Sequence, residues 1–478
     1  MPEPRHVAGV NMADFGFDTF LSPMTWRYGT PEMKNVWSEE SKRKMLRKIW
    51  VALAEVQSEA GLVSQSQLDE LSAHADDIDI ERSLEIESAI HHDLMAEIRT
   101  YAEQCPQAGG VIHLGCTSMD IEDNMDALRL RDALDIVKAK LRRVLEVFSQ
   151  RIRETSDIRC MAFTHIQSAE PTTVGYRLSQ TAQDLLASLE GLQSIIIKGK
   201  GFKGAVGTGA SFETLLEGSG WDFDRFESAV MDRLGIPAFD VATQVYTRRQ
   251  DVEVLQSLSL LCCSIHKFAL DFRILQGSSV GEVNEFFSEK QVGSSAMPFK
   301  RNPINSEKIC SLCRLVRSYE LDAWDNASLC ILERTLDDSA NRRVCLPEAF
   351  IAVDEILETM IRLVGRMIVN RGPIERNFDK FGVFAASERL LMKLGMLGGD
   401  RQLFHEVIRE ESLKAWEAVK EGRTNPLSDL LASNAEIAEF MSPSEVRACL
   451  DAGEYVGIAP KRAILVADQI DSALGDKR

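Results

Sequence analysis

The sequence lacks an excess of positive charge. Its 478 residues include 55 Lys and Arg against 73 Asp and Glu, which gives a formal net charge of −18. Proteins that bind nucleic acid by neutralising its phosphates carry a basic excess or a clustered basic face. The deficit therefore predicts that nucleic acid is not a partner.

Long apolar runs are also missing. No stretch approaches the ~18 residues of a membrane-spanning helix, so no membrane partner is expected. The N-terminal segment has neither the basic start nor the apolar stretch of a secretory signal. The chain is too long for one core, and its composition is globular, which predicts a cytoplasmic enzyme of two or three domains.

Cysteines are few for this length. The 10 cysteines are scattered, which suits reduced thiols better than a disulfide framework. Cys310 and Cys313 have the spacing of metal ligands, but a structural zinc site needs four ligands and no second pair is near. We expect both to be core residues.

Proline is scarce between residues 118 and 370, so long helices can form there. Apolar residues repeat at intervals of three or four over residues 46–60, 130–152, 255–275, 309–319 and 356–367. The first of these stripes lies between cap-type residues Ser38 and Gly61. The second is expected on a helix that begins near Asp126. The fourth is expected on a helix from about Asn305 to Leu332.

Alternating strand patterns are scarce, so the fold is predicted to be all-α, with a long central helix bundle. We expect an N-terminal helical domain over residues 1–117, the central bundle over residues 118–370, and a C-terminal helical domain over residues 371–478.

Four polar segments interrupt the amphipathic pattern, and the first covers residues 113–124. Thr117, Ser118 or Asp120 can cap the following helix, and the same groups can form a carboxylate or phosphate site. A calcium loop is excluded because Met125 and Arg131 replace the required Gly and Glu.

The second and third segments cover residues 164–173 and 199–209. His165 is expected near a helix start, where a lone histidine is usually structural, but nearby Thr, Gln and Glu favour a functional role. The glycine-rich third segment has Walker-like spacing. However, Ala210 and Ser211 replace the Lys-Ser/Thr of a phosphate loop, which excludes a nucleoside triphosphatase.

The fourth segment, residues 292–303, is predicted to be an exposed loop between two long helices. A simple connector has no need of two serines followed closely by Lys300, Arg301 and Asn302, which together offer hydroxyls, positive charge and amide donors.

Together these segments resemble the fumarase/aspartase superfamily of lyases, whose loop signature matches GSSxMPxKxN at residues 293–302. The stretch ERTLDDSANRR at residues 333–343 resembles the adenylosuccinate lyase family rather than argininosuccinate lyase, fumarase or aspartase. Residues 27–33, 92–93 and 201–212 are similar as well. The likeness extends from about residue 20 to at least residue 405.

The resemblance implies a three-domain all-α subunit in a homotetramer whose active sites are shared between chains. It implies β-elimination of fumarate from adenylosuccinate, giving AMP, and from succinylaminoimidazole carboxamide ribotide (SAICAR), giving the corresponding carboxamide ribotide (AICAR). Both reactions belong to purine nucleotide biosynthesis, and neither requires a cofactor or metal.

Residue roles follow from the same resemblance. Ser294 is expected to be the general base and His165 the general acid, with His92 beside it. Lys300 and Asn302 are expected to hold the carboxylate on which negative charge develops. The expected substrate-binding residues are Arg27, Tyr28, His91, Asp93, Thr117, Ser118, Gln244, Lys308, Arg334, Ser339 and Arg343.

Two positions depart from the family pattern: His91 replaces a frequent Arg, and Lys308 replaces the Arg of some members. Because lysine is a point charge rather than a bidentate fork, anion binding there is expected to differ. The cations Arg27, Lys300, Arg301, Lys308, Arg334, Arg342 and Arg343 are expected to converge on the site, with the acidic excess on helix faces.

Two alternatives remain. One is another elimination substrate within the superfamily, such as argininosuccinate or a carboxymuconate, which residues 333–343 disfavour. The other is a non-catalytic protein on the same scaffold. A purely structural role gives no reason for His165, Ser294, Lys300 and Asn302 to occur together.

Overall fold

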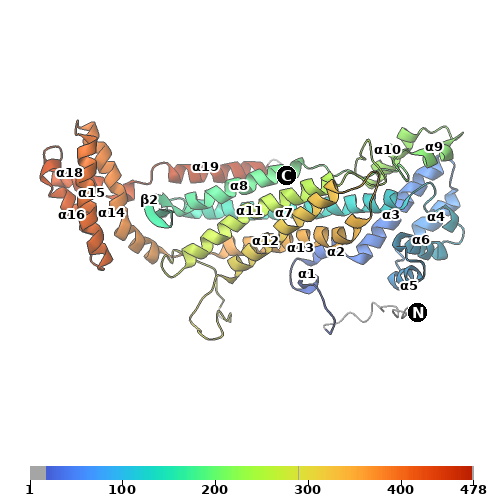
Figure 1. Cartoon of the computed structure of the whole chain (residues 1–478), viewed down its shortest axis with the longest axis horizontal. Coiled ribbons are helices and arrows are strands. Elements are labelled where there is room, and N and C mark those ends of the chain that lie inside the picture. Colours follow the sequence, from blue (N-terminus) through green and yellow to red (C-terminus); the bar gives the residue numbers. More distant parts are fainter. Residues whose placement is uncertain (1–17, 289, 476–478) are drawn as a thin grey trace. The chain divides into compact units, whose positions relative to one another are not determined.

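The computed structural model describes residues 18–288 and 290–475, and these residues confirm the all-α prediction (Figure 1). The helices of the first half are α1 (Pro23–Trp26), α2 (Pro31–Val36), α3 (Glu39–Glu59), α4 (Gln65–Ala73), α5 (Ile80–Ile90), α6 (Asp93–Gln104), η2 (Gly109–Val111), α7 (Ser118–Thr155), α8 (Val174–Ser194), α9 (Ala210–Leu216) and α10 (Phe223–Leu234). Those of the second half are α11 (Arg249–Gln276), α12 (Ile304–Ser328), α13 (Asp337–Arg366), α14 (Arg371–Met396), α15 (Arg401–Lys420), α16 (Leu427–Ala432), α17 (Ala435–Ala438), α18 (Pro443–Cys449), η3 (Ala452–Glu454) and α19 (Ala459–Gly475).

Strands form only two small antiparallel sheets in the described residues. In one sheet, β1 (Arg159–Thr164) pairs with β2 (Gln167–Thr173). In the other, β3 (Val283–Asn284) pairs with β4 (Ile368–Val369). No helix in the described part of the chain has the length and apolar character needed to cross a membrane.

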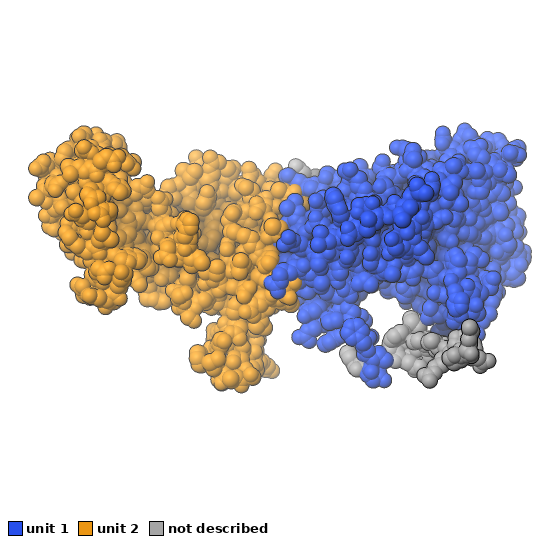
Figure 2. Space-filling model, in the orientation of Figure 1, with its two compact units in different colours: residues 1–140, 190–262, 312–356 blue, residues 141–189, 263–311, 357–478 orange. Residues whose placement is uncertain are grey.

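The chain divides into two compact units built from interleaved segments (Figure 2). Unit 1 comprises residues 1–140, 190–262 and 312–356, and unit 2 comprises residues 141–189, 263–311 and 357–478. The boundaries fall inside α7, α8, α11, α12 and α13. Each of these five helices therefore contributes residues to both units.

The predicted caps and stripe of α3 are confirmed. The Ser38 hydroxyl accepts the Ser41 N–H at 3.1 Å, and Gly61 follows the helix with a φ of 76°, in the left-handed region that ends helices. Leu46, Ile49 and Val56 are at most 2% exposed. Helix α3 thus buries one apolar face in the core of unit 1.

The start of α7 was predicted too late. The helix begins at Ser118 rather than near Asp126, because Asp120 accepts the Thr117 N–H at 2.8 Å and so stabilises an earlier first turn. Met119, Ile121 and Met125 are buried and extend the apolar stripe towards this end. The polar segment before Asp126 is therefore helical from residue 118 onwards.

Helix α12 ends before the predicted position. It spans Ile304–Ser328 instead of running to Leu332. The apolar residues beyond its end do not continue the buried face, since Leu329 and Leu332 are exposed, and Leu332 has a φ of 51°. Cys310 and Cys313 are buried in this helix, and all ten cysteines are free thiols.

The C-terminal part of unit 2 has its own apolar core. Leu390 and Leu394 of α14 pack with Phe404 of α15 and with Leu427 and Leu431 of α16. Helix α14 also packs against both strands of the β1–β2 hairpin. This core supports the hairpin, whose tip carries His165.

Candidate active site

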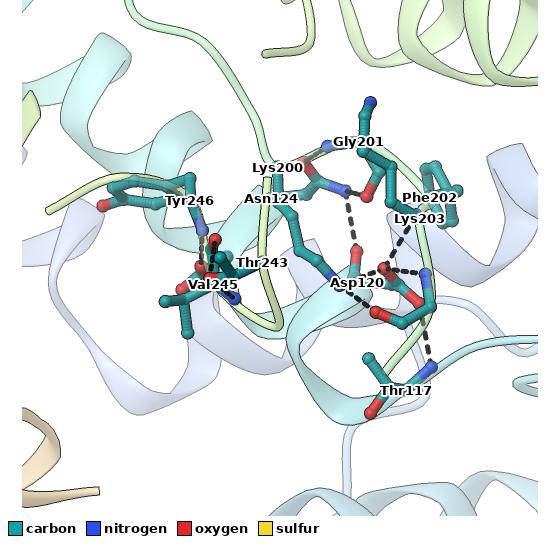
Figure 3. Close-up of polar contacts among 12 residues, drawn as sticks. Thr117, Asp120, Asn124, Lys200, Gly201, Phe202, Lys203, Thr243, Val245 and Tyr246 are labelled. Carbon is teal, nitrogen blue, oxygen red and sulfur yellow. Dashed lines mark hydrogen bonds and ion pairs between the residues drawn. The ribbon is translucent and has the colours of Figure 1, made fainter. Parts of the chain in front are cut away.

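The N-terminus of α7 in unit 1 is fixed by Asp120 (Figure 3). Besides the Thr117 N–H, its carboxylate accepts the ammonium of Lys200 at 2.5 Å and the N–H groups of Lys203 and Gly204, each at 3.1 Å. Asp120 and Lys200 are completely buried. Because Asp120 caps the helix, the Thr117 and Ser118 hydroxyls make no hydrogen bond to any described residue and can accept or donate to a ligand.

The glycine-rich segment 199–209 lies against this helix start (Figure 3). Asn124 donates from its amide to the Gly201 carbonyl and accepts the Gly201 N–H, both at 3.1 Å. Lys203 forms an ion pair with Glu227 at 2.6 Å. Residues 199–204 of the segment are thus buried and support the helix start that carries Thr117 and Ser118.

A second buried network holds the segment before α11. The Asp123 carboxylate accepts the Tyr246 N–H at 2.7 Å and the Arg248 guanidinium at 2.9 Å. Arg248 also donates to Asp338, at the start of α13, at 2.8 Å. Within the same region the Gln244 N–H donates to the Glu333 carbonyl at 3.2 Å. These bonds place Gln244 next to the segment that carries Arg334.

Arg342 connects α13 to α7 and α11. Its guanidinium donates to Asp251 at 2.8 Å and to the Tyr246 hydroxyl at 2.9 Å, and it forms an ion pair with Asp126 at 3.1 Å. Arg342 was expected among the cations that converge on the site. It is buried and held by these three partners, and it also lines one cavity of unit 1 together with Arg334 and Arg343.

Arg334, Ser339 and Arg343 line one cavity of unit 1, with a volume of about 140 Å³. Its wall comes from α3, α7, α13, the segment before α13, and the residues Trp37 and Arg248 that precede α3 and α11. The three residues had been predicted to bind substrate, and the structure brings them together. An arginine pair with a hydroxyl is suited to hold a phosphate group.

His91, His92 and Asp93 form the junction between α5 and α6 in unit 1. His91 ends α5 with a φ of 56°, and His92 begins α6 by accepting the Met95 N–H on Nδ1 at 3.4 Å. This bond leaves Nε2 of His92 as the proton donor of a neutral ring. Both histidines are exposed, so they can reach a ligand.

Asp93 links this junction to the cavity through an ion pair with Arg343 at 2.6 Å. Burial favours a higher pKa for Asp93, but the Arg343 hydrogen bond and the charge of Lys42 outweigh it and lower the pKa. Asp93 therefore remains ionised and orients Arg343, which is consistent with its predicted place in the site.

Arg27 and Tyr28 lie just after α1, also in unit 1. Arg27 is exposed, with its guanidinium 5.6 Å from the Trp26 ring centroid. Neither residue has a described hydrogen bond to the cavity residues named above. Their contact with substrate therefore stays a prediction.

His165 lies at the tip of the β1–β2 hairpin in unit 2, not near a helix start as expected. Thr164 pairs with Gln167, so His165 and Ile166 form a two-residue turn, with φ angles of 54° and 62°. The sequence contains no Gly or Asn at this turn, so it gives no signal of a hairpin. Positive φ is unusual for any residue but glycine and costly for a β-branched one, and such strain is typical of functional turns.

Ile166 offers a direct test of this strain. Replacing it by glycine removes the penalty of a positive φ, and its side chain is 74% exposed, so little burial is lost. We expect Ile166→Gly to raise stability by about 1 kcal/mol, measured by chemical denaturation. The matched control is Ile196→Gly, where an isoleucine 69% exposed has no positive φ and should lose stability. A lower stability of Ile166→Gly than of the wild type would contradict the turn geometry.

The loop at residues 292–303 is exposed, as predicted. The Ser294 hydroxyl accepts the N–H groups of Ala296 and Met297 at 3.3 and 3.1 Å. Asn302 donates from its amide to the Gly293 carbonyl at 2.9 Å. A Cβ on Gly293 would lie 2.0 Å from the Lys300 carbonyl oxygen, so only glycine fits there.

Glu285 anchors the end of this loop within unit 2. Its carboxylate accepts the N–H and amide of Asn305 at 3.1 and 2.7 Å, and the N–H and hydroxyl of Ser306, both at 2.8 Å. These bonds cap α12 and fix the helix that carries Lys308. In the described residues, no hydrogen bond or ion pair joins the loop to the hairpin tip.

The structure thus brings some of the candidate residues together and leaves others on separate segments. In unit 1, Asp93 contacts Arg343, and Arg334, Ser339 and Arg343 share a cavity. In unit 2, Ser294 and Asn302 are organised by the loop itself, while His165 stands on a separate hairpin. Sequence reasoning missed the buried partners that hold these groups, Lys200, Arg248 and Glu285, since nothing in their local sequence marks them.

Comparison with known proteins identifies the class. A family model described as "Lyase" matches residues 22–318, and one described as "Adenylosuccinate lyase C-terminus" matches residues 384–463. A fumarate lyase from Mesorhizobium sp. BNC1 has a TM-score of 0.79 and 22% identity, over 94% of this chain and 98% of that one. A 3-carboxy-cis,cis-muconate lactonizing enzyme from Pseudomonas putida has a TM-score of 0.82 and 23% identity, over 94% and 99%. The fold is therefore that of the lyases.

Proteins with similar sequences identify the family within this class. Adenylosuccinate lyase of Schistosoma mansoni is 36% identical over 96% of each chain. Adenylosuccinate lyase of Saccharomyces cerevisiae is 36% identical over 93% of each, and that of Archaeoglobus fulgidus is 34% identical over 95% of this chain and 99% of its own. The chain belongs to the adenylosuccinate lyase family.

Proposed function

We propose that the protein cleaves adenylosuccinate to AMP and fumarate, and SAICAR to AICAR and fumarate, in purine nucleotide biosynthesis. The observation that carries this proposal is the full-length similarity to adenylosuccinate lyases. The cavity that unites Arg334, Ser339 and Arg343 supports it, because both substrates carry a phosphate monoester.

Ser294 is proposed to remove the proton from the carbon β to the leaving nitrogen. A serine hydroxyl is a weak base unless its anion is stabilised. The two N–H groups that Ser294 already accepts supply part of that stabilisation. Lys300 and Asn302 are proposed to bind the substrate carboxylate, on which the electrons of the broken C–H bond accumulate. In the described structure the Lys300 ammonium has no partner and is available for this task.

His165 is proposed to give a proton to the departing nitrogen as the carbon–nitrogen bond breaks and the double bond of fumarate forms. Imidazole suits this step near neutral pH. The hairpin supports the role because it presents His165 to solvent on a two-residue turn. His92 is proposed to orient the leaving group through its Nε2–H.

The remaining residues are proposed to hold the ends of the substrate. Arg27, Tyr28, Arg334, Ser339 and Arg343 would bind the phosphate and ribose. Thr117 and Ser118 would bind a succinyl carboxylate, helped by the free N–H groups at the start of α7. The other proposed contacts are His91, Asp93, Gln244 and Lys308.

Four further features belong to the proposal. They are a homotetramer, active sites shared between chains, a cytoplasmic location, and three domains over residues 1–117, 118–370 and 371–478. The ten free thiols fit a reducing compartment. Large exposed apolar residues such as Leu260, Leu321 and Trp324 fit a surface that another subunit covers.

The activity is tested by incubating purified protein with adenylosuccinate and following ultraviolet absorbance as AMP forms. A parallel panel with SAICAR, argininosuccinate and a carboxymuconate separates this function from other eliminations. Turnover of adenylosuccinate and SAICAR is expected. Turnover of argininosuccinate or the carboxymuconate alone would favour the alternative substrate. If none of the four compounds is converted, the proposed enzymatic activity is refuted.

Shared sites can be tested by mixing variants. His165→Ala and Ser294→Ala proteins are each expected to be inactive. After subunit exchange, mixed tetramers should regain part of the wild-type rate, because some sites then receive an intact histidine and an intact serine. Mass spectrometry of differently labelled chains verifies exchange. Complete exchange without any recovered activity would contradict shared sites.

A further inference from the structure

One carboxyl group in the unit 1 cavity has no partner of its own. Glu122 of α7 lines the cavity, yet in the described part of the chain it makes no hydrogen bond or ion pair. The other acidic residues of the wall are each ion-paired: Glu39 with Arg43, Asp126 with Arg342, and Asp338 with Arg248. Glu122 is therefore the wall carboxyl most sensitive to a charge that enters the cavity.

Charged groups from each element of the cavity wall surround Glu122. They are Lys42 and Glu39 of α3, Asp93 of α6, Asp126 and Arg129 of α7, Arg248 before α11, Arg334 before α13, and Arg342 and Arg343 of α13. Burial and the negative charges of Asp93 and Asp126 disfavour ionisation, and the nearby cations offset this only in part. Together they raise the pKa of Glu122 to about 7. The group thus exchanges a proton near neutral pH.

We propose that Glu122 takes up a proton when a phosphate monoester binds in this cavity, and that it thereby sets the affinity for the anion. The inference rests on the proposed function, which brings the substrate phosphate to Arg334, Ser339 and Arg343. A phosphate dianion there would stand against an ionised Glu122 in a confined space, where like charges repel strongly. Protonation removes the repulsion and converts the carboxyl group into a hydrogen-bond donor.

The sign of the pH dependence follows. Below the pKa of free Glu122 the carboxyl is already protonated, so Glu122 takes up no proton on binding and adds no pH dependence to the affinity. Above that pKa each binding event must protonate Glu122, so the dissociation constant rises with pH. Between pH 7 and pH 9 we expect it to rise about tenfold for AMP. Glu122 is a positioning residue for the phosphate and takes no part in the elimination.

The experiment is calorimetric titration of the full-length protein with AMP at pH 8, in HEPES and in Tris, whose ionisation enthalpies differ. At this pH the AMP phosphate is already a dianion, since its second pKa is about 6. Wild-type protein should take up more than about half a proton per AMP. Glu122→Gln should take up none, and its dissociation constant should not change between pH 7 and pH 9.

Two controls separate proton uptake from simple loss of charge. Glu39→Gln also removes a negative charge from the cavity wall, but from a residue already paired with Arg43, so proton uptake should persist. Adenosine lacks the phosphate and should bind without proton uptake. Glu122→Ala provides a second variant, and thermal denaturation verifies that each variant is folded.

The outcomes distinguish this inference from the proposed function. Binding of AMP to wild-type protein without proton uptake would overturn the inference, even if adenylosuccinate is cleaved. Proton uptake retained by Glu122→Gln and Glu122→Ala would do the same, because another group would then be responsible. If AMP does not bind and adenylosuccinate is not cleaved, both the inference and the proposed function fail.

Discussion

Ser294→Ala is expected to lower kcat for adenylosuccinate by roughly 10²–10⁴-fold, because it removes the proposed base. The Michaelis constant should change little, since the hydroxyl acts on the reacting carbon rather than on binding. The matched control is Ser295→Ala, because Ser295 is the exposed neighbour in the same loop.

Steady-state rates of the two variants, measured by the absorbance change, decide the question. Ser295→Ala should retain activity within a few-fold of the wild type, while Ser294→Ala should be nearly inactive. The circular dichroism spectra should be the same for all three proteins. If Ser294→Ala keeps more than about a tenth of the wild-type kcat, Ser294 is not the base.

Asp120→Ala is expected to lower the free energy of unfolding by about 3–5 kcal/mol. The substitution leaves the buried ammonium of Lys200 without its carboxylate, and it removes the acceptor of the N–H groups of Thr117, Lys203 and Gly204. Asp120→Asn keeps the shape of the side chain without its charge and should lower the free energy of unfolding by less than Asp120→Ala does. Urea denaturation followed by circular dichroism measures all three proteins.

The control for Asp120 is an exposed ion pair. Lys414→Ala breaks the contact with Glu411 at 2.9 Å, where the lysine side chain is 61% exposed, and should cost less than about 1 kcal/mol. An equal loss for both variants would mean that the buried network contributes no more than a surface pair. If Asp120→Ala does not fold, Asp120→Asn alone decides between these outcomes.

Local patterns predicted the helices well, because a buried stripe of α3 or α7 repeats within the sequence itself. The patterns failed at helix ends, whose positions depend on side-chain hydrogen bonds and on burial. Asp120 starts α7 early, and exposure of Leu329 ends the buried face of α12. The hairpin was missed because His165 and Ile166 adopt backbone angles that their residue types do not favour.

The motifs indicated candidate site residues but not the buried partners that hold them in place. The motifs indicated Arg334, Ser339 and Arg343, and the structure brings them to one cavity. They could not show that Arg342, one residue from Arg343, is a buried structural cation, because the difference lies in which helix face meets Asp251 and Asp126. The environment of Glu122 depends on four helices and has no local signature either.

The interleaved order of the units has a consequence for synthesis on the ribosome. The buried ion pair of Lys140 with Asp354 joins residues 214 positions apart within unit 1. At translation rates of about 5–20 residues per second, Lys140 waits roughly 10–40 s for its partner to be made. Throughout that interval the N-terminal helices expose apolar faces that later segments cover, so the nascent chain needs protection from aggregation until residue 356 has emerged.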